Sequence, residues 1–397
     1  MKLESKFADR MARIKPSAIR KIMEQVAKPG ITSFAGGLPD PELFPVDKLR
    51  SLLDDVLSKD GKIALQYSAT AGLLSLREKI SARMKKAGVN CGPENVLVVQ
   101  GGQQGLDLMG KLFLNKGDTV ITENPTFLSG LSAIEQYEAN VKCCGMDQDG
   151  LRLEELEEVL RENPGVKFLY TISDFQNPMG VTLSLARRKK LLELAAKYDF
   201  IILEDSPYRE IRYDGEHVPS IKSLDTDGRV VFVGSFSKIL SPGMRLGWVV
   251  ASEAIISKLS LLKQPTDTQC STLNQCLVDR FIEKYDLDEH INGLIRVYKR
   301  KKDLMLQTMK ETFPSSASWT NPEGGLFTWL TIDPRLDAEA VLMEHLLDEA
   351  RAAYVPGAAF FPLQPERNHA RINFSEMSEE AIRSGIGKMG ATLKKLG

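Results

Sequence analysis

Short apolar runs, many of them β-branched, alternate with stretches of helical periodicity through the middle of the chain. The runs read VLVV (96–99), TVIT (119–122), KFLYTI (167–172), FIILE (200–204), RVVFVG (229–234) and LGWVV (246–250). Between them, apolar residues recur at helical spacing over 103–114, 128–137, 152–162 and 184–198. Fully apolar strands separated by helices are typical of a parallel sheet that is covered on both faces. We therefore predict an α/β fold with a mostly parallel sheet.

The two ends of the chain follow other patterns. Residues 33–45, SFAGGLPDPELFP, are too rich in Gly and Pro for a regular element. Towards the C-terminus we expect elements at 286–312, 324–332, 337–350, 352–357, 370–375 and 377–395. Strands and helices are segregated there, which is typical of a smaller α+β domain. The sequence thus predicts an N-terminal arm over 1–45, a large domain over 46–285 and a small domain over 286–397.

Composition and charge restrict the possible partners. With 397 residues, 43% of them hydrophobic and 26% charged, the chain is an ordinary globular protein with room for two domains. The net charge is −1 and no long basic run occurs, so we expect no nucleic-acid partner. No apolar run approaches the roughly 20 residues of a membrane helix, and the N-terminus lacks an apolar signal segment. The expected partner is a small molecule held in a pocket.

Cysteine and histidine spacing indicates neither a metal site nor a disulfide framework. The cysteines are odd in number and lack a CxxC spacing, and they are Cys91, Cys143, Cys144, Cys270 and Cys276. This pattern is typical of reduced thiols in a cytoplasmic protein. The histidines show no HExxH-like spacing, and they are His217, His290, His345 and His369. We therefore expect a cytoplasmic protein without a bound metal.

Polar residues follow several of the predicted strands, where ligands bind in open α/β sheets. The turn QGGQQ (100–104) after VLVV suits a phosphate at a helix N-terminus, although an ordinary tight turn has the same residues. Asn177 lies in QNPMG after KFLYTI, a segment that a plain Asn-Pro loop would also contain. Asp205 and Tyr208 follow FIILE, where the carboxylate either needs a partner or caps a helix.

The segment after RVVFVG carries the strongest signal. It reads SFSKILSPGMR and holds two hydroxyls, a lysine and an arginine, namely Ser235, Ser237, Lys238 and Arg245. A lone lysine near a strand end is usually solvated, but here the chain returns directly to a core strand. Pyridoxal 5′-phosphate (PLP) needs a lysine for its imine, a cradle of hydroxyls, arginine and backbone N–H groups, and a carboxylate at its ring nitrogen. Together with Asn177, Asp205 and Tyr208, these residues predict a PLP site.

With these motifs the chain resembles the PLP-dependent aminotransferases of fold type I, class I/II. The order NPxG, DxxY, SxSK and PGxR carries the resemblance, which covers essentially the whole chain. Within this class, FAGGLPDPELFP, QYSATAGLLSLRE, GGQQGLDL, PEGGLFTWL and VPGAAFF are similar to the 2-aminoadipate and kynurenine aminotransferase II-like branch. The resemblance implies an aspartate aminotransferase-like fold, in which a mostly parallel sheet of the seven-stranded type lies between helices beside a smaller α+β domain.

The resemblance also implies roles for the matching residues. Lys238 would form the internal aldimine and later move a proton between the substrate Cα and the cofactor. Asp205 would pair with the pyridinium nitrogen, while Tyr208 and Asn177 would bond the ring oxygen. The other cofactor-binding residues implied are Tyr67, Gly102, Gln103, Phe127, Ser235, Ser237 and Arg245. Of these, Phe127 would stack on the ring and Tyr67 would reach the phosphate of a neighbouring subunit, which implies a homodimer with shared active sites.

Substrate contacts follow from the same resemblance. Arg371 would bind the α-carboxylate in a bidentate pair, and Asn177 would lie beside it. Gly37 would let the N-terminal loop close over the carboxylate. Arg20 matches a position that meets an acidic side chain in some relatives, although a solvated helix arginine has the same sequence context. The amino donor is left open.

Some positions depart from the family pattern. Phe127 stands where relatives often have Tyr, and Gly102 stands where a Ser often donates to the phosphate. In the NPxG segment, Met179 replaces the usual Thr. These departures leave the cofactor chemistry intact and weaken inferences about the substrate.

The resemblance implies a ping-pong transamination between an L-amino acid and a 2-oxo acid, with 2-oxoglutarate as the expected acceptor. Two alternatives use the same residues. One is another fold-type-I PLP enzyme, such as a β-lyase or a cyclopropane-forming synthase. The other is a PLP-binding transcription regulator, which the lack of a basic patch disfavours.

Overall fold

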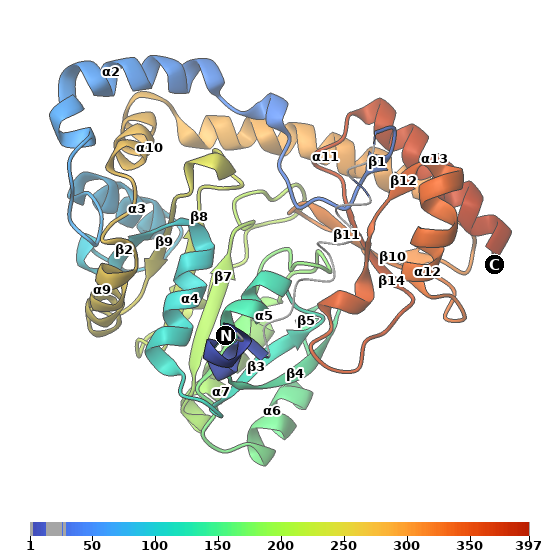
Figure 1. Ribbon diagram of the computed structural model, residues 1–397, viewed down its shortest axis with the longest axis horizontal. Coiled ribbons are helices and arrows are strands. Elements are labelled where there is room, and N and C mark those ends of the chain that lie inside the picture. The colour runs from blue at the N-terminus through green and yellow to red at the C-terminus, as the bar shows by residue number, and fades with distance from the viewer. Residues whose placement is uncertain (1–2, 13–25, 27–28, 397) are drawn as a thin grey trace.

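The computed structural model describes residues 3–12, 26 and 29–396. Its largest element is an eight-stranded sheet with the order β2-β9-β8-β7-β6-β3-β4-β5 (Figure 1). The strands are β2 (Val96–Val99), β9 (Gly247–Val250), β8 (Val230–Ser235), β7 (Ile201–Ser206), β6 (Phe168–Thr171), β3 (Thr119–Asn124), β4 (Asn140–Asp147) and β5 (Gly150–Leu151). From β8 to β4 all neighbours are parallel, whereas β9 is antiparallel to both β2 and β8. The predicted mostly parallel sheet is confirmed, and β5 adds a two-residue hairpin at one edge.

Both faces of this sheet are buried, as the apolar runs predict. Along β3, for example, Val120 belongs to one hydrophobic core and the next residue, Ile121, to another. Such alternation follows from the two-residue period of a strand. The first core includes residues from the helices α3 (Leu74–Lys86), α4 (Gly101–Phe113), α5 (Leu128–Glu135), α9 (Glu253–Asp267) and α10 (Thr272–Lys284). The second includes residues from α6 (Leu153–Glu162), α7 (Leu185–Tyr198) and α8 (Ile221–Leu224).

The C-terminal part forms a smaller α+β unit, seen at the right of Figure 1. Its antiparallel sheet has the order β10-β11-β14-β13, with β10 (Ser318–Trp319), β11 (Phe327–Thr331), β14 (His369–Asn373) and β13 (Val355–Pro356). Helix α12 (Ala338–Val341), the π-helix Leu342–Ala350 and α13 (Glu379–Leu396) cover it. Strand β1 (Thr32–Ser33) of the N-terminal arm pairs with β12 (Ala352–Ala353), so the arm packs on this unit.

Helix α11 (Leu287–Thr312) joins the two units along the top of Figure 1, where α2 (Val46–Ala64) also lies. The buried face of α11 repeats every three or four residues, as expected for an amphipathic helix. In its first half, Leu287, Ile291 and Leu294 belong to the core of the large unit. In its second half, Met305 and Met309 belong to the core of the small unit. The helix is therefore shared between the two cores.

The predicted division at 1–45, 46–285 and 286–397 stays a proposal. It is supported by the separate core of the small unit, which includes Phe34 of the arm. The two ends of α11 nevertheless belong to different cores, so the boundary after residue 285 falls beside an element that both units use.

Several elements differ from the predicted ones. Strand β4 was not predicted because seven of its eight residues are exposed or partly exposed, and its sequence, NVKCCGMD, is not continuously apolar. Helices α9 and α10 were also not predicted. The helix expected over 337–350 begins as α-helix and continues as π-helix from Leu342. Among the described residues, no helix is long and apolar enough to cross a membrane.

A buried ion cluster fixes the segment between β6 and α7. Asp174 accepts from Arg188 Nη2 over 2.9 Å and from Arg209 Nη1 over 3.1 Å, and both Asp174 and Arg188 are almost fully buried. Arg188 also donates to the carbonyl groups of Leu183 and Ser173. Since Asp174 faces two guanidinium groups, its charge is needed to compensate theirs.

We predict that Asp174→Asn lowers the free energy of unfolding by about 3 to 5 kcal/mol, because it leaves buried guanidinium groups without a counter-charge. Denaturant unfolding followed by circular dichroism measures this loss. As a control, Asp47→Asn removes a carboxylate that is 91% exposed and pairs only at the surface with Arg50; this change should leave the midpoint unaltered. Equal midpoints for the two variants would contradict a structural role of Asp174.

Candidate active site

A cavity of about 370 Å³ lies beyond the ends of β7 and β8, facing residues of the small unit. All of the predicted site residues except Tyr67 and Arg20 line it. They are Gly37, Gly102, Gln103, Phe127, Asn177, Asp205, Tyr208, Ser235, Ser237, Lys238, Arg245 and Arg371. The fold therefore brings together residues that lie more than 300 positions apart in the sequence.

Asp205 is the acidic group of this cavity. It lies near the end of β7, is buried, and accepts a hydrogen bond of 2.9 Å from the hydroxyl of Tyr170 on the neighbouring strand β6. Burial raises the pKa of Asp205 to about 7, and the bond from Tyr170 offsets only part of this effect. Among the described residues, no cationic side chain pairs with Asp205. A cation beside this carboxylate would therefore be strongly favoured.

Lys238 follows β8 and points across the cavity to the N-terminal arm. Its Nζ donates to the carbonyl oxygen of Gly37 over 2.7 Å. Burial, together with the charges of Arg371 and Arg245, lowers the pKa of Lys238 to about 8. A larger fraction of this amine is therefore neutral near pH 8 than in an exposed lysine, as a nucleophile or proton acceptor requires.

The opposite end of the cavity is suited to an anion. The first turn of α4 begins at Gly101, and the unpaired backbone N–H groups of such a turn attract negative charge. Ser235, Ser237 and Arg245 add two hydroxyls and a guanidinium to this end. Gly101 has φ +69°, and a Cβ there would lie 2.7 Å from Arg245 Nη2, so only glycine allows this close approach. Together these groups form a cradle for a phosphate.

Arg371, on β14, is a buried guanidinium without an acidic partner among the described residues. Its Nη1 donates to Asn177 Oδ1 over 3.0 Å and its Nη2 to the Ala35 carbonyl over 2.9 Å. Its Nε is buried without a hydrogen-bond partner, and its guanidinium lies over the rings of Phe327 and Phe360 at 4.3 and 5.1 Å. This geometry leaves Arg371 available for a carboxylate.

Asn177 links this arginine to Tyr208. Its Nδ2 donates to the Tyr208 hydroxyl over 3.4 Å, while its Oδ1 accepts from Arg371. Burial raises the pKa of Tyr208 well above its ordinary value. The three polar groups thus form a chain across the cavity, from the carboxylate-binding side towards Asp205.

Four further predicted residues lie as follows. Phe127 precedes α5 and lines the cavity, as does Gly37, where a Cβ would lie 3.5 Å from the Phe327 ring. Tyr67 is 78% exposed, in the segment between α2 and α3, and does not line the cavity. Arg20 lies outside the described residues.

Three residues of the site were not singled out from the sequence. Tyr170 supports Asp205, and Phe327 and Phe360 lie against Arg371. Tyr170 lies within the run KFLYTI, where a hydroxyl at a buried strand position needs a hydrogen-bond partner and so could have been noticed. The two phenylalanines lie in PEGGLFTWL and VPGAAFF, two segments that carry the family resemblance, but nothing in those segments indicates a contact with Arg371.

The residues of the cavity fit PLP as a group. The buried carboxylate of Asp205 suits a protonated ring nitrogen, the cradle around Arg245 suits the phosphate, and the amine of Lys238 suits the aldehyde. Arg371 then remains for the carboxylate of a substrate. The fit rests on charges that lack partners among the described residues and on the close approach that Gly101 allows.

Comparison with known proteins agrees with this geometry. The family model for aminotransferase class I and II matches residues 37–389. The chain is 41% identical over 397 residues to aromatic-amino-acid aminotransferase 1 of Thermococcus litoralis, in a match that covers 99% of this chain and 95% of that protein.

Two solved structures are similar over the whole chain. The multiple substrate aminotransferase of Thermococcus profundus has a TM-score of 0.95 and 40% identity, with 100% of this chain and 99% of that one covered. The alpha-aminoadipate aminotransferase of Thermus thermophilus, complexed with N-(5′-phosphopyridoxyl)-L-leucine, has a TM-score of 0.92 and 34% identity, with the same coverage. The chain therefore belongs to the class I and II aminotransferases, and it is an enzyme that transfers amino groups.

Proposed function

We propose that this aminotransferase moves the amino group of an L-amino acid to a 2-oxo acid, with 2-oxoglutarate as acceptor, in two half-reactions at Lys238. The enzyme uses PLP, as its family indicates. When bound, this cofactor supplies an electron sink for the negative charge that develops at the substrate Cα. The observation that carries the proposal is the placement of Lys238, Asp205 and Arg371 in one cavity.

Arg371 binds the α-carboxylate of both substrates. Its guanidinium is buried, its Nε lacks a hydrogen-bond partner, and Asn177 and the Ala35 carbonyl hold its other two nitrogens in place. A planar guanidinium fixed in this way matches a carboxylate with two parallel hydrogen bonds. The contact orients the substrate so that its Cα faces Lys238.

Lys238 would hold the cofactor covalently and, when free, would accept and return the proton at the substrate Cα. Its lowered pKa of about 8 keeps a useful fraction of the amine neutral for this task. Asp205 would keep the ring nitrogen protonated, and Tyr208 and Asn177 would bond the ring oxygen. The phosphate would be held by the first turn of α4 with Gly102 and Gln103, by the hydroxyls of Ser235 and Ser237, and by Arg245. Phe127 would lie against the ring.

A homodimer with shared active sites is supported by the exposed surface between α2 and α3. Tyr67 lies there, and the exposed apolar side chains near it along the sequence are Ile63, Leu65 and Leu74. Contiguous exposed apolar groups are typical of protein interfaces. In the dimer Tyr67 reaches the phosphate held by the partner chain. Sedimentation equilibrium tests this arrangement, which a monomer of full activity would rule out.

Two further expectations belong to the proposal. The five cysteines are all free, which supports a cytoplasmic location. Arg20 would bind an acidic side chain of the substrate. A panel of amino donors with 2-oxoglutarate tests this last point, since acidic donors should react fastest if Arg20 has that role.

Replacing Lys238 by alanine should reduce amino transfer by at least about 100-fold, because both covalent attachment and proton transfer depend on its amine. The near-visible absorbance of lysine-bound PLP should also be absent, and borohydride should fix no pyridoxyl group at this position. Lys258→Ala, an exposed lysine of α9, is the matched control and should behave as the wild type. A pyridoxyl label on another lysine of the unaltered chain would refute the assignment.

Replacing Arg371 by leucine should raise KM for donor and acceptor by at least about 30-fold, since the loss of a buried charge-assisted contact costs about 2 to 5 kcal/mol. The absorbance of the bound cofactor should persist, which separates this effect from cofactor loss. Arg367→Leu, which changes a largely exposed arginine paired with Asp337, should leave KM unaltered. An unchanged KM in Arg371→Leu would place the carboxylate elsewhere.

The rate at which cofactor-free protein attaches PLP should rise with pH through about 8. A lysine whose pKa is lowered from 10.5 to about 8 has about one tenth of its amine neutral at pH 7 and about nine tenths at pH 9. We therefore expect the attachment rate to increase about ten-fold over this interval and then level off. Stopped-flow absorbance measures it. A rate that climbs as steeply between pH 9 and 10 would show that the pKa of Lys238 is not lowered.

A further inference from the structure

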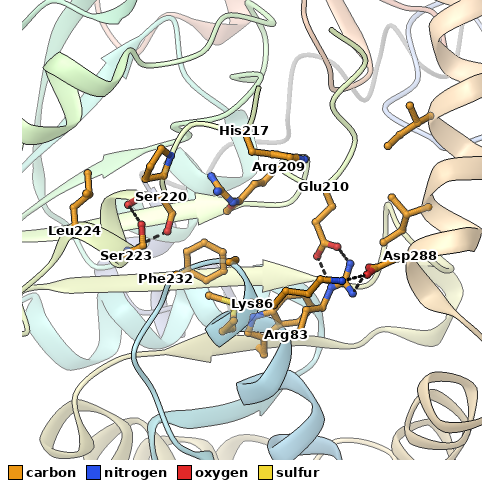
Figure 2. A pocket seen from close by; sticks show the side chains of 18 of the residues that line it. Arg83, Lys86, Arg209, Glu210, His217, Ser220, Ser223, Leu224, Phe232 and Asp288 are labelled. Carbon is orange, nitrogen blue, oxygen red and sulfur yellow. Dashed lines mark hydrogen bonds and ion pairs between the residues drawn. The ribbon is translucent and has the colours of Figure 1, made fainter. Parts of the chain in front are cut away.

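A second cavity, of about 740 Å³, lies in the large unit behind the active site. Its size is within the range of small-molecule sites. It is lined by the end of α3, the segment between β7 and α8, the strands β8 and β9, and the N-terminal half of α11. Figure 2 shows the side chains around it. The described residues that line it are all different from those that line the active-site cavity.

The two cavities lie on opposite faces of the same strands. On β7, Asp205 lines the active-site cavity and the next residue, Ser206, lines the second cavity. On β8, Ser235 lines the active-site cavity and Phe232 lines the second cavity. This follows from the alternation of side chains along a strand. The second cavity is therefore a separate space, which the proposed function does not use and on which it does not depend.

Two buried polar atoms belong to side chains that line this cavity and have no hydrogen-bond partner among the described residues. They are Ser206 Oγ and Trp248 Nε1, in side chains that are 7% and 3% exposed. The indole N–H can only donate, and buried donors are almost always paired. Gly234 makes room for the indole, because a Cβ at that position would lie 2.3 Å from Trp248 Cε2. Both atoms are themselves inaccessible to solvent, so they lie within the wall and do not face the open space of the cavity.

One side of the cavity carries excess positive charge. Arg209 shares the single carboxylate of Asp174 with Arg188, so two guanidinium groups face one negative charge. Within the described part of the chain, Arg209 donates only through Nη1, to Asp174 and to the Val218 carbonyl. His217 also lines this side, and burial and the nearby arginines lower its pKa. An anion is therefore favoured beside Arg209.

The other charged side is already balanced. Arg83 pairs with both Glu210 and Asp288, and Lys86 pairs with Asp288. Figure 2 shows this cluster apart from Arg209 and His217. The remaining walls are mostly apolar, with Met84, Leu224, Phe232, Ile291 and Ile295 among the lining residues.

We propose that this cavity is a second binding site for a small monocarboxylate with an apolar body. The carboxylate lies beside Arg209, where it compensates the excess charge and accepts from the guanidinium nitrogens that have no hydrogen-bond partner among the described residues. The apolar body packs between Phe232 and Ile291. A dicarboxylate fits less well, because the cations described on the far side, Arg83 and Lys86, are already paired with Glu210 and Asp288.

The test uses 3-phenylpropionate, which has neither an amino nor an oxo group and so cannot react. Isothermal titration of the PLP-loaded enzyme should give two equivalents bound per chain, one at Arg371 and one at Arg209. Arg371→Leu should retain one equivalent. In that background, Asn292→Trp, at an exposed lining position on α11, should block the cavity and abolish binding.

The neutral 3-phenylpropionamide should bind Arg371→Leu at least about ten-fold more weakly than the acid, since it lacks the charge that Arg209 attracts. Binding of the acid should also change tryptophan emission, and Trp248→Phe in the same background should remove that change. No binding to Arg371→Leu would show that the cavity takes only water. Binding that survives Asn292→Trp, or equal affinity for the amide, would also overturn the proposal. These readouts measure binding alone, so they stand apart from any failure of the transamination assay.

Discussion

A carboxylate buried at the end of a parallel strand is the constraint on which the active site depends. Asp205 is held among apolar strands and has one hydrogen bond, from Tyr170, which does not neutralise its charge. Burial therefore favours the protonated form up to a pH of about 7 unless a cation lies beside it. The cation that fits is a protonated ring nitrogen. Lys238, the proposed phosphate-binding residues and Arg371 line the same cavity as this carboxylate.

A second buried carboxyl supports the loop that carries Asn177. Glu123 accepts from the Thr171 hydroxyl, the Ile172 amide and Gln176 Nε2. Gln176 also accepts from the Met179 amide, so the turn around Asn177 is held from both sides. Burial raises the pKa of Glu123 to about 7, while the three hydrogen bonds act in the opposite direction. The position of Asn177 beside Arg371 thus depends on Glu123 and Gln176, which do not line the cavity.

The sequence allows much of this to be predicted, and the exceptions have physical reasons. Runs such as RVVFVG predict buried strands because both faces are covered, whereas the partly exposed β4 lacks that signal. The sequence identifies Lys238 and Asp205 as candidate site residues because they closely follow predicted apolar strands, where ligands bind in such sheets. Arg371 came only from family resemblance, since the pairing of β14 with β11 that brings it to the site is not written in its local sequence. The second cavity could not be predicted, because its lining comes from several separate elements.

Helix α11 has a consequence for how such a chain can be recombined. Over 26 residues it spans about 39 Å, at about 1.5 Å per residue, and its two halves are anchored in different cores. An exchange of C-terminal halves between homologous chains at residue 286 would therefore pair a foreign helix with the native side chains of the large core. The junction of a chimera should therefore lie after α11. Otherwise the side chains that pack against α11 should come from the same parent chain as the helix. The two units thus share α11 as a common structural element, although each has its own core.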